Sequence, residues 1–482
     1  MLLVALVTIL TLTLLLYITY RKKRLPGPWN LPIIGYIHKL DPVAPYLTLT
    51  KLAQKYGPVY GIKLGLMDVA VIADGKILKK VLAKNETIER PPLYMLNTVF
   101  QGKGIVYTSG HVWKNHRKLV ANFFKMTGAN KFSPNKKSCE ALIEKYVDEF
   151  IQVVTTQGDY IVRDPWELVT RYVTSVASTL LQGKPFSWDD ENFLVLRKNL
   201  DVVGELSAPG TPLNFLPFLR FLPQFKEKVN SLKVALRKIR EIQSKLIDDC
   251  RKSTSDFSSN LIEIFLLQIS KDNKDMYDLD QLPYLVYDLY MAFTTAPISY
   301  IMWIFLHMAQ HEDIQDKVRQ ELLEVGQGKK IEMNDLANLH YTKATIAEVG
   351  RISTTGPLGF PHYASQDICV EGFHIAKGTT IMPLLWGIHM DPNVWKNPEE
   401  FRPERFLTDD GKFYKPEAFV PFQSGKRICV GDEITITIAS ILIARVLQNF
   451  KLGCVDSSPI DFTGVCGITF NSKPQEILFT KI

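Results

Sequence analysis

Residues 421–431 read Pro-Phe-Gln-Ser-Gly-Lys-Arg-Ile-Cys-Val-Gly, and the interpretation of the whole chain starts from this run. Gly425 and Gly431 flank the cysteine and permit a tight turn whose backbone can approach a flat group closely. A cysteine presented from such a turn is typical of a thiolate that binds the iron of a porphyrin. The run therefore predicts that Cys429 is an iron ligand.

The residues around Cys429 fit the same prediction. Phe422 would pack beside the sulfur and exclude water, and Arg427 would pair with a haem propionate. A helix predicted from about Asp432 would direct its positive N-terminal end toward the anionic ligand. The alternative is a buried structural cysteine beside a glycine turn. The pattern Phe-x-x-Gly-x-Arg-x-Cys-x-Gly fixes five residue types in ten positions, however, and such a pattern is rare by chance.

Three features elsewhere in the chain strengthen this interpretation. Glu348 and Arg351 share one face of a predicted helix and can form a buried ion pair. Arg405 follows that helix and precedes the cysteine run, so it can complete a Glu-Arg-Arg network. Upstream, Trp113 and Arg117 stand one helical turn apart and offer an indole donor and a guanidinium. Each feature alone has an ordinary explanation, namely a surface ion pair, a polar loop or an amphipathic helix. Together and in this order, they specifically indicate a haem-thiolate protein.

With these motifs the chain resembles the cytochrome P-450 superfamily of haem-thiolate monooxygenases, and the match runs from Pro26 to the C-terminus. It has the form of the microsomal animal enzymes of the second family clan. The resemblance implies haem b as the cofactor and Cys429 as its proximal ligand. It also implies a core beneath the haem that is held by Glu348, Arg351 and Arg405. It assigns the propionates to Trp113, Arg117, His362 and Arg427, and it places Lys103 where many members carry an additional arginine.

In this family one helix crosses the distal face of the haem, and the corresponding segment here departs from the usual sequence pattern. The usual pattern is Asp-Leu-Phe-x-Ala-Gly-x-Glu/Asp-Thr-Thr, whereas residues 288–297 read Asp-Leu-Tyr-Met-Ala-Phe-Thr-Thr-Ala-Pro. In this register Phe293 replaces the glycine that leaves room for dioxygen, and Ala296 replaces the threonine that relays protons. Thr295 becomes the candidate catalytic proton donor, because Pro297 removes a backbone hydrogen bond and permits a local shift. A substrate hydroxyl or an ordered water is an alternative donor.

Three functions follow from the resemblance and its departures. The first is a monooxygenase that hydroxylates or epoxidises a lipophilic substrate such as a steroid, terpenoid, fatty acid or xenobiotic. Its electrons would come from an NADPH-dependent flavoprotein reductase, since the chain has no Gly-x-Gly-x-x-Gly motif after a strand. The alternatives are a haem-thiolate isomerase or dehydratase of lipid peroxides and a non-catalytic haem or ligand-binding protein. Residues 40–65 are similar to arthropod members that act on steroid or terpenoid hormones, but this segment is scaffold.

The N-terminus predicts a membrane anchor. Residues 1–20 contain no charged side chain, and residues 21–24 read Arg-Lys-Lys-Arg. That apolar length spans a bilayer and the cations remain on the cytosolic side, which predicts an endoplasmic reticulum membrane protein with a cytosolic catalytic domain. A cleaved signal peptide is the alternative, but no small-x-small cleavage site is evident. We expect a basic and proline-rich linker at 21–35 and one catalytic domain at 36–482.

Composition limits the partners. The net charge of +7 is mild for 482 residues, and no basic patch is interleaved with aromatic residues, so nucleic-acid binding is not expected. Anionic lipid and an acidic redox partner fit better, with Lys114, Lys118 and Lys426 as a candidate docking patch. The other five of the six cysteines should be reduced in the cytosol, and none forms a Cys-x-x-Cys zinc motif.

Hydrophobic periodicity predicts an α+β fold that is mostly α-helical and contains small β-sheets. The predicted strands are 59–64 and 68–73, and 368–376 with 379–382 suggests another small sheet. The clearest predicted helices are 138–157, 224–251 and 282–323.

Overall fold

The structure is a computed structural model of the 482-residue chain. It describes residues 25–129, 133, 135–156, 161–162, 164–187, 189–206, 210–252, 260–270, 277–455 and 458–482. The predicted membrane anchor at 1–20 and the basic cluster at 21–24 lie outside the described residues.

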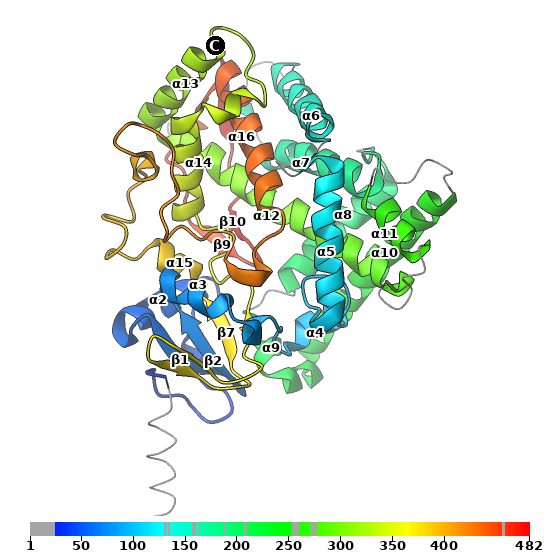
Figure 1. The fold of residues 1–482 in the computed structure, drawn as a ribbon, viewed down its shortest axis with the longest axis vertical. Helices are drawn as coiled ribbons and strands as arrows, with labels where there is room; N and C mark the ends of the chain where they lie inside the picture. Colours follow the sequence, from blue (N-terminus) through cyan, green and yellow to red (C-terminus); the bar gives the residue numbers. More distant parts are fainter. Residues whose placement is uncertain are drawn as a thin grey trace, which may run out of the picture.

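Helices make up most of the molecule, and the largest sheet lies at one end together with α2 and α3 (Figure 1). The predicted mostly helical α+β fold is confirmed. The α-helices are α2 (Pro45–Tyr56), α3 (Gly75–Leu82), α4 (Tyr94–Phe100), α5 (Gly110–Thr127), α6 (Lys136–Thr156), α7 (Pro165–Gln182), α8 (Glu191–Leu206), α9 (Pro212–Phe215), α10 (Pro223–Lys252), α11 (Leu261–Ser270), α12 (Leu282–Gln310), α13 (Glu312–Gly326), α14 (His340–Ile352), α15 (Leu385–His389) and α16 (Asp432–Asn449).

Four small sheets accompany these helices. The strand orders are β1-β2-β7-β4, β3-β11-β8, β10-β9 and β5-β6. The strands are β1 (Val59–Leu64), β2 (Met67–Ile72), β3 (Ile161–Val162), β4 (His362–Tyr363), β5 (Ile368–Val370), β6 (Phe373–Ile375), β7 (Thr380–Pro383), β8 (Phe450–Gly453), β9 (Gly464–Cys466), β10 (Phe470–Ser472) and β11 (Ile477–Lys481).

Two predicted elements differ from the structure. The segment 368–382 was expected to form one small sheet, but only β5 and β6 pair as a hairpin, while β7 lies parallel to β2. All four residues of β7 are buried, so an interior position in the larger sheet removes more apolar surface from water. The predicted helix 282–323 is two helices, because the backbone leaves helical geometry at His311 and the acidic Glu312 and Asp313 begin α13.

Helix α12 is the central helix of the fold, and its burial explains its composition. Among the described residues, the segment Leu279–Gln310 is the one helix long and apolar enough to cross a membrane, but 78% of its most apolar window is buried inside the protein. Trp303 is fully buried and donates from Nε1 to the carbonyl of Phe470 at 2.7 Å. A helix that is apolar on every face is expected at the centre of a large core.

The stretch expected as a linker is already part of the fold from Leu25 onward. The backbone N–H of Gly61 donates to the carbonyl of Pro26 at 2.8 Å, and that of Lys63 donates to Oδ1 of Asn30 at 2.9 Å. Residues 25–35 therefore run along β1, and the part of the domain that the structure describes begins before residue 36.

Candidate functional site

A cavity of about 310 Å³ lies between α5, α12, the start of α16 and the loop that carries Cys429. The cysteine is exposed and belongs to the wall of this cavity. The enclosing protein desolvates the sulfur and so raises the pKa of the Cys429 thiol, while the N–H of Gly431 and the guanidinium of Arg117 act in the opposite direction. The site thus presents one accessible sulfur to an enclosed space.

The cysteine loop is held in shape by close backbone contacts. The N–H of Cys429 donates to the carbonyl of Phe422 at 3.2 Å. Gly425 has φ +74°, and a Cβ there would lie 2.1 Å from the carbonyl oxygen of Leu82, so only glycine fits. Gln423 also adopts a positive φ of 61°, which is unusual for a residue with a side chain.

Three arginines line the same cavity without an acidic partner among the described residues. Arg90 donates to the carbonyls of Val106 at 2.9 Å and Pro361 at 2.6 Å. Arg427 donates to the carbonyl of Ile88 at 2.7 Å. The third is Arg117. The carbonyl dipoles around Arg90 and Arg427 solvate the charges of these two residues but do not neutralise them.

Burial and mutual repulsion make this cluster costly without an anion. Burial lowers the pKa of Arg427 to about 8, and the neighbouring charge of Arg90 adds to this. Burial likewise lowers the pKa of Arg90 to about 10. The guanidinium of Arg427 lies 4.4 Å from the ring centre of Trp113, which also lines the cavity. The donor set fits a ligand with more than one negative charge, such as the two carboxylates of haem.

The predicted Glu-Arg-Arg network is present between α14 and the segment around residues 402–405. Glu348 and Arg351 lie on α14 and are fully buried. Arg351 donates from Nε and Nη2 to the two carboxylate oxygens of Glu348, each at 2.7 Å. Arg405 donates from Nε to Oε1 of Glu348 at 3.2 Å, and the backbone N–H of Arg402 donates to the same oxygen at 2.9 Å. These bonds fasten α14 to the chain that leads into the cysteine loop.

Helix α12 forms another wall of the cavity, with Ala292, Thr295 and Ala296 along it. Phe293 borders the cavity too, but its ring packs against Phe124 of α5, with 6.1 Å between the ring centres. Only 6% of its surface is exposed. The wall thus combines these small side chains with larger ones of α12 such as Leu289, Met291 and Phe293, and the ring of Phe293 is partly occupied by its contact with α5.

The hydroxyls of this helix turn are bound to the helix itself. Thr295 donates from Oγ1 to the carbonyl of Met291 at 2.8 Å, and Thr294 bonds the carbonyl of Tyr290 in the same way. Pro297 has no N–H, so the carbonyl of Phe293 lacks its usual helical donor. Thr295 lines the cavity, and its oxygen retains the capacity to accept a further hydrogen bond.

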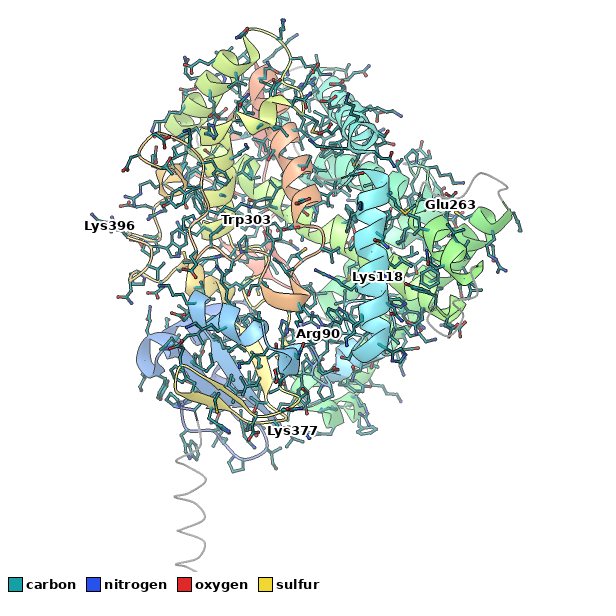
Figure 2. The ribbon with its side chains drawn as sticks, viewed as in Figure 1. Arg90, Lys118, Glu263, Trp303, Lys377 and Lys396 are labelled. Atoms are coloured by element: carbon teal, nitrogen blue, oxygen red, sulfur yellow. The ribbon has the colours of Figure 1, made fainter. Side chains whose placement is uncertain are left out.

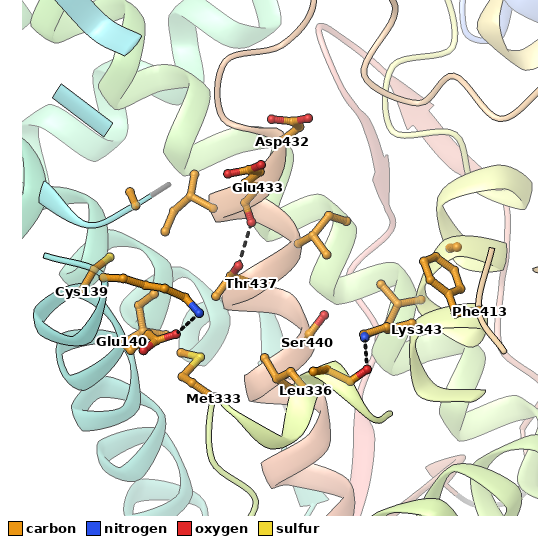
Figure 3. A pocket seen from close by; sticks show the side chains of 18 of the residues that line it. Cys139, Glu140, Met333, Leu336, Lys343, Phe413, Asp432, Glu433, Thr437 and Ser440 are labelled. Carbon is orange, nitrogen blue, oxygen red and sulfur yellow. Dashed lines mark hydrogen bonds and ion pairs between the residues drawn. The ribbon is translucent and has the colours of Figure 1, made fainter. Parts of the chain in front are cut away.

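A second hollow of about 690 Å³ lies on the other side of the cysteine loop, between α6, α14 and α16 (Figure 3). Asp432 and Glu433 stand at the start of α16 and belong to its wall (Figure 3). Phe422, Tyr300 and Ile434 border both cavities. These three side chains therefore lie between the cavity that contains Cys429 and this hollow.

A model of the cytochrome P450 family matches residues 25–479. The chain belongs to the cytochrome P450 family. It is 31% identical to cytochrome P450 2U1 of Bos taurus over 449 residues, which cover 90% of this chain and 81% of that protein. It is 27% identical to cytochrome P450 306a1 of Drosophila melanogaster, with 95% and 89% covered, and 27% identical to cytochrome P450 18a1 of the same organism, with 98% and 90% covered.

This P450 is accordingly a haem-dependent monooxygenase in the general sense of its family. The cavity fits haem on its own chemistry, because it combines an accessible cysteine sulfur with three guanidinium groups that lack acidic partners. Of the residues predicted for the site, the structure brings the following to the cavity wall: Trp113, Arg117, Thr295, Phe422, Arg427 and Cys429.

Lys103 is not among them, and its expected contact with a propionate is not supported. Its Nζ lies 3.9 Å from Oδ2 of Asp280 and 5.2 Å from the ring centre of Tyr284. The ammonium is thus attracted to an acid and an aromatic face outside the cavity.

His362 is also set back from the cavity wall. It is buried, with Nδ1 2.8 Å from the carbonyl of Thr87 and Nε2 3.1 Å from Oε1 of Gln423. Gln423 itself lines the cavity and donates from Nε2 to the carbonyl of Phe360 at 3.2 Å. His362 therefore contacts the cavity wall through Gln423, and its predicted role at a propionate stays a prediction.

Sequence reasoning missed Arg90 and Gln423. Arg90 precedes Pro91 and Pro92, which favour an extended backbone, but nothing local relates it to the cysteine loop far along the chain. Gln423 lies inside the cysteine motif at a position that the pattern leaves open. The only sequence signal for Gln423 was its position within a tight turn, where a long amide side chain requires hydrogen-bond partners.

The buried network yields a stability prediction. Glu348→Ala or Arg351→Ala should leave a partner charge buried without compensation, which costs about 3–5 kcal/mol. We expect little haem-loaded protein from either variant, measured as haem content per polypeptide. Lys80→Ala, which breaks an exposed pair with Glu371, is the control and should retain normal haem content. Normal haem content in both core variants would contradict this role.

The accessible sulfur yields a spectroscopic prediction. Cys429→Ala should abolish the red-shifted Soret band of the reduced carbonyl complex, because that band requires a thiolate on the iron. Cys369→Ala removes an exposed thiol from β5 and should leave the band intact. Survival of the band in the Cys429 variant would assign the iron ligand elsewhere.

Proposed function

We propose that this P450 inserts one atom of dioxygen into a lipophilic small molecule such as a steroid, terpenoid, fatty acid or xenobiotic. The observation that carries this proposal is the cavity wall of Ala292, Phe293 and Ala296, which continues to the sulfur of Cys429. An apolar, enclosed wall beside the reactive centre suits a substrate that leaves water for a hydrophobic site. One oxygen atom enters the substrate and the other leaves as water, which consumes two electrons and two protons.

The residues at the cavity divide the task of holding haem. We assign the iron to Cys429 and the propionates to Arg90, Arg117, Arg427 and Trp113, whose cationic and indole groups border the same space. When bound, the haem supplies the iron at which dioxygen is activated. Phe422 borders both the cavity and the second hollow, so we assign it the task of keeping water from the sulfur.

Thr295 is the side chain best placed to hold a proton at the distal wall. Its hydroxyl donates a hydrogen bond to the carbonyl of Met291, and its oxygen can still accept a hydrogen bond from water or substrate. The carbonyl of Phe293, left without its helical donor by Pro297, offers a second acceptor on the same turn. Together these groups replace the acid and threonine that the family usually carries here.

Electrons reach this site, in our proposal, from an NADPH-dependent flavoprotein reductase. Lys114 and Lys118 are exposed on α5, the helix whose Arg117 reaches the cavity, and Figure 2 shows Lys118 on this helix. Lys426 is exposed on the cysteine loop, where it contacts Asn85. A cationic surface on the outside of the thiolate site suits an acidic redox partner.

The distal wall yields the test of this function. Thr295→Val keeps the shape of the side chain and removes the hydroxyl, so the rate of product formation should fall, by up to the 10²–10⁴-fold that is typical of a lost general acid, and less product should form per NADPH consumed. Adding Ala296→Thr to this variant should recover part of the loss. The assay measures product, oxygen uptake and NADPH with a reconstituted reductase.

Thr294→Val is the matched control, since Thr294 makes the same bond one residue earlier but does not line the cavity. Its coupling should equal that of the unmodified chain. Equal coupling in Thr295→Val would remove Thr295 from the mechanism. Turnover of a lipid hydroperoxide without reductase or NADPH, and no product with them, would instead establish the isomerase reaction.

We further propose that the protein is held in the endoplasmic reticulum membrane with its catalytic domain in the cytosol. A glycosylation acceptor placed before Met1 should be modified in microsomes, because the cations at 21–24 hold the other end of the segment in the cytosol. The chain supplies its own control in Asn85-Glu86-Thr87, an acceptor sequence that should stay unmodified. Glycosylation of Asn85 would place the domain in the lumen.

A further inference from the structure

The second hollow, on the other side of the cysteine loop from the haem cavity, has the size and the lining of a small-molecule site. Its volume of about 690 Å³ falls within the roughly 300–1,000 Å³ of pockets that take small ligands. Most of the side chains on its wall are apolar, and they include Ile143, Met333, Ile346, Phe413 and Ile436. Because apolar surface gains free energy when it leaves water, the hollow favours a ligand with an apolar body.

Lys343 of α14 brings a positive charge to this wall. Its Nζ donates to the carbonyl of Ala337 at 2.7 Å (Figure 3). The ammonium forms no ion pair with a carboxylate among the residues that the structure describes. It is half-buried, and this burial lowers the pKa of Lys343, while the charge of Glu321 acts in the opposite direction. The wall therefore holds a partly desolvated cation that one carbonyl dipole solvates.

The carboxylate of Glu321 is committed to other donors. It accepts hydrogen bonds from the backbone N–H groups of Tyr341 at 2.7 Å and Thr342 at 2.8 Å. The hydroxyl of Thr342 also donates to it, at 2.7 Å. An ammonium has three N–H donors, so Lys343 has two beyond the one given to Ala337. An anion is the ligand that such a group binds most strongly.

The other charges on the wall restrict what kind of anion fits. Lys136 and Glu140 pair with each other at 3.0 Å. Asp432 and Glu433 stand at the start of α16, well apart from Lys343 in the hollow (Figure 3). An acidic protein surface would bring several carboxylates against these acids. A ligand with one carboxylate can bind Lys343 and keep its apolar part away from them.

We propose that the hollow binds a fatty acid, with its carboxylate on Lys343 and its acyl chain against Ile143, Met333 and Ile436. The site is distinct from the cavity that we assign to haem and substrate, so the inference goes beyond the proposed monooxygenase function. Phe422 borders both spaces, so the fatty acid would lie against a side chain that also faces the cavity of the cysteine.

The test compares dodecanoate with 1-dodecanol, which share a carbon chain and differ in charge. Each competes with the fluorescent cis-parinaric acid for the ferric, haem-loaded full chain at pH 7.4, where the carboxylate is ionised. Lys343→Met keeps an unbranched apolar stem and removes the ammonium. The affinity for dodecanoate should fall about ten-fold or more in this variant, as expected for a lost hydrogen bond between charged groups, whereas that for dodecanol should stay the same.

Lys80→Met is the matched control, because it removes an exposed lysine that pairs with Glu371 and does not line the hollow. Its affinities should equal those of the unmodified chain. All chains are measured in one detergent, so the partition of the probes into micelles cancels between variants. An unchanged affinity for dodecanoate in Lys343→Met overturns the assignment.

Photolabelling of the unmodified chain decides the question even if Lys343→Met fails to load haem. A fatty acid with a diazirine on its chain should label peptides that contain Ile143, Met333 or Ile436, and excess dodecanoate should prevent the labelling. Labelling confined to α12 would place the fatty acid in the haem cavity and refute the proposal. The absence of saturable labelling would refute it too, and protection of these peptides from hydrogen exchange by the reductase would then make the hollow a protein-docking surface. Neither measurement needs turnover, so each result is independent of the monooxygenase function.

Discussion

The buried carboxylate of Glu348 is the constraint on which the cysteine loop depends. It accepts bonds from the guanidiniums of Arg351 and Arg405 and from the backbone N–H of Arg402, and both of its oxygens are used. Because the group is fully buried, water cannot replace any of these donors. Helix α14 and the segment before the cysteine loop are thus fixed to each other by protein groups alone, without a contribution from a cofactor.

The cavity depends on the opposite arrangement, in which charge is left uncompensated. Arg90, Arg117 and Arg427 border one space. Arg90 and Arg427 donate to carbonyls, and Arg427 lies over the indole ring of Trp113, while none of the three forms an ion pair with a carboxylate among the described residues. Such a cluster gains most from an anionic cofactor, so binding of the cofactor and stability of the fold are linked. In the arrangement that we propose, the network around Glu348 provides rigidity and the arginines provide affinity for the haem propionates.

The sequence predicted the elements that carry short, dense motifs and failed where contacts join distant segments. The cysteine loop and the Glu348 network were foreseen because spacing alone constrains them. The assignments of Lys103 and His362 to the propionates stay predictions: in the structure Lys103 lies near Asp280 and His362 near Gln423, and no local pattern reveals these contacts. Arg90 was missed because its hydrogen bonds reach Val106 and the distant Pro361, a separation that no local pattern encodes. Strand β7 was misplaced because parallel pairing with β2 bridges a separation that periodicity does not encode.

The bend at Gly104 ties the shape of the cavity to a residue outside its wall. Gly104 has φ +79°, and a Cβ there would lie 2.3 Å from Oδ2 of Asp288, a residue of the cavity wall whose carboxylate accepts bonds from the N–H groups of Ile105 and Val106. Gly104 itself is not part of that wall. A substitution at Gly104 would therefore displace a residue of the cavity, and a comparison of pocket residues alone would overlook it.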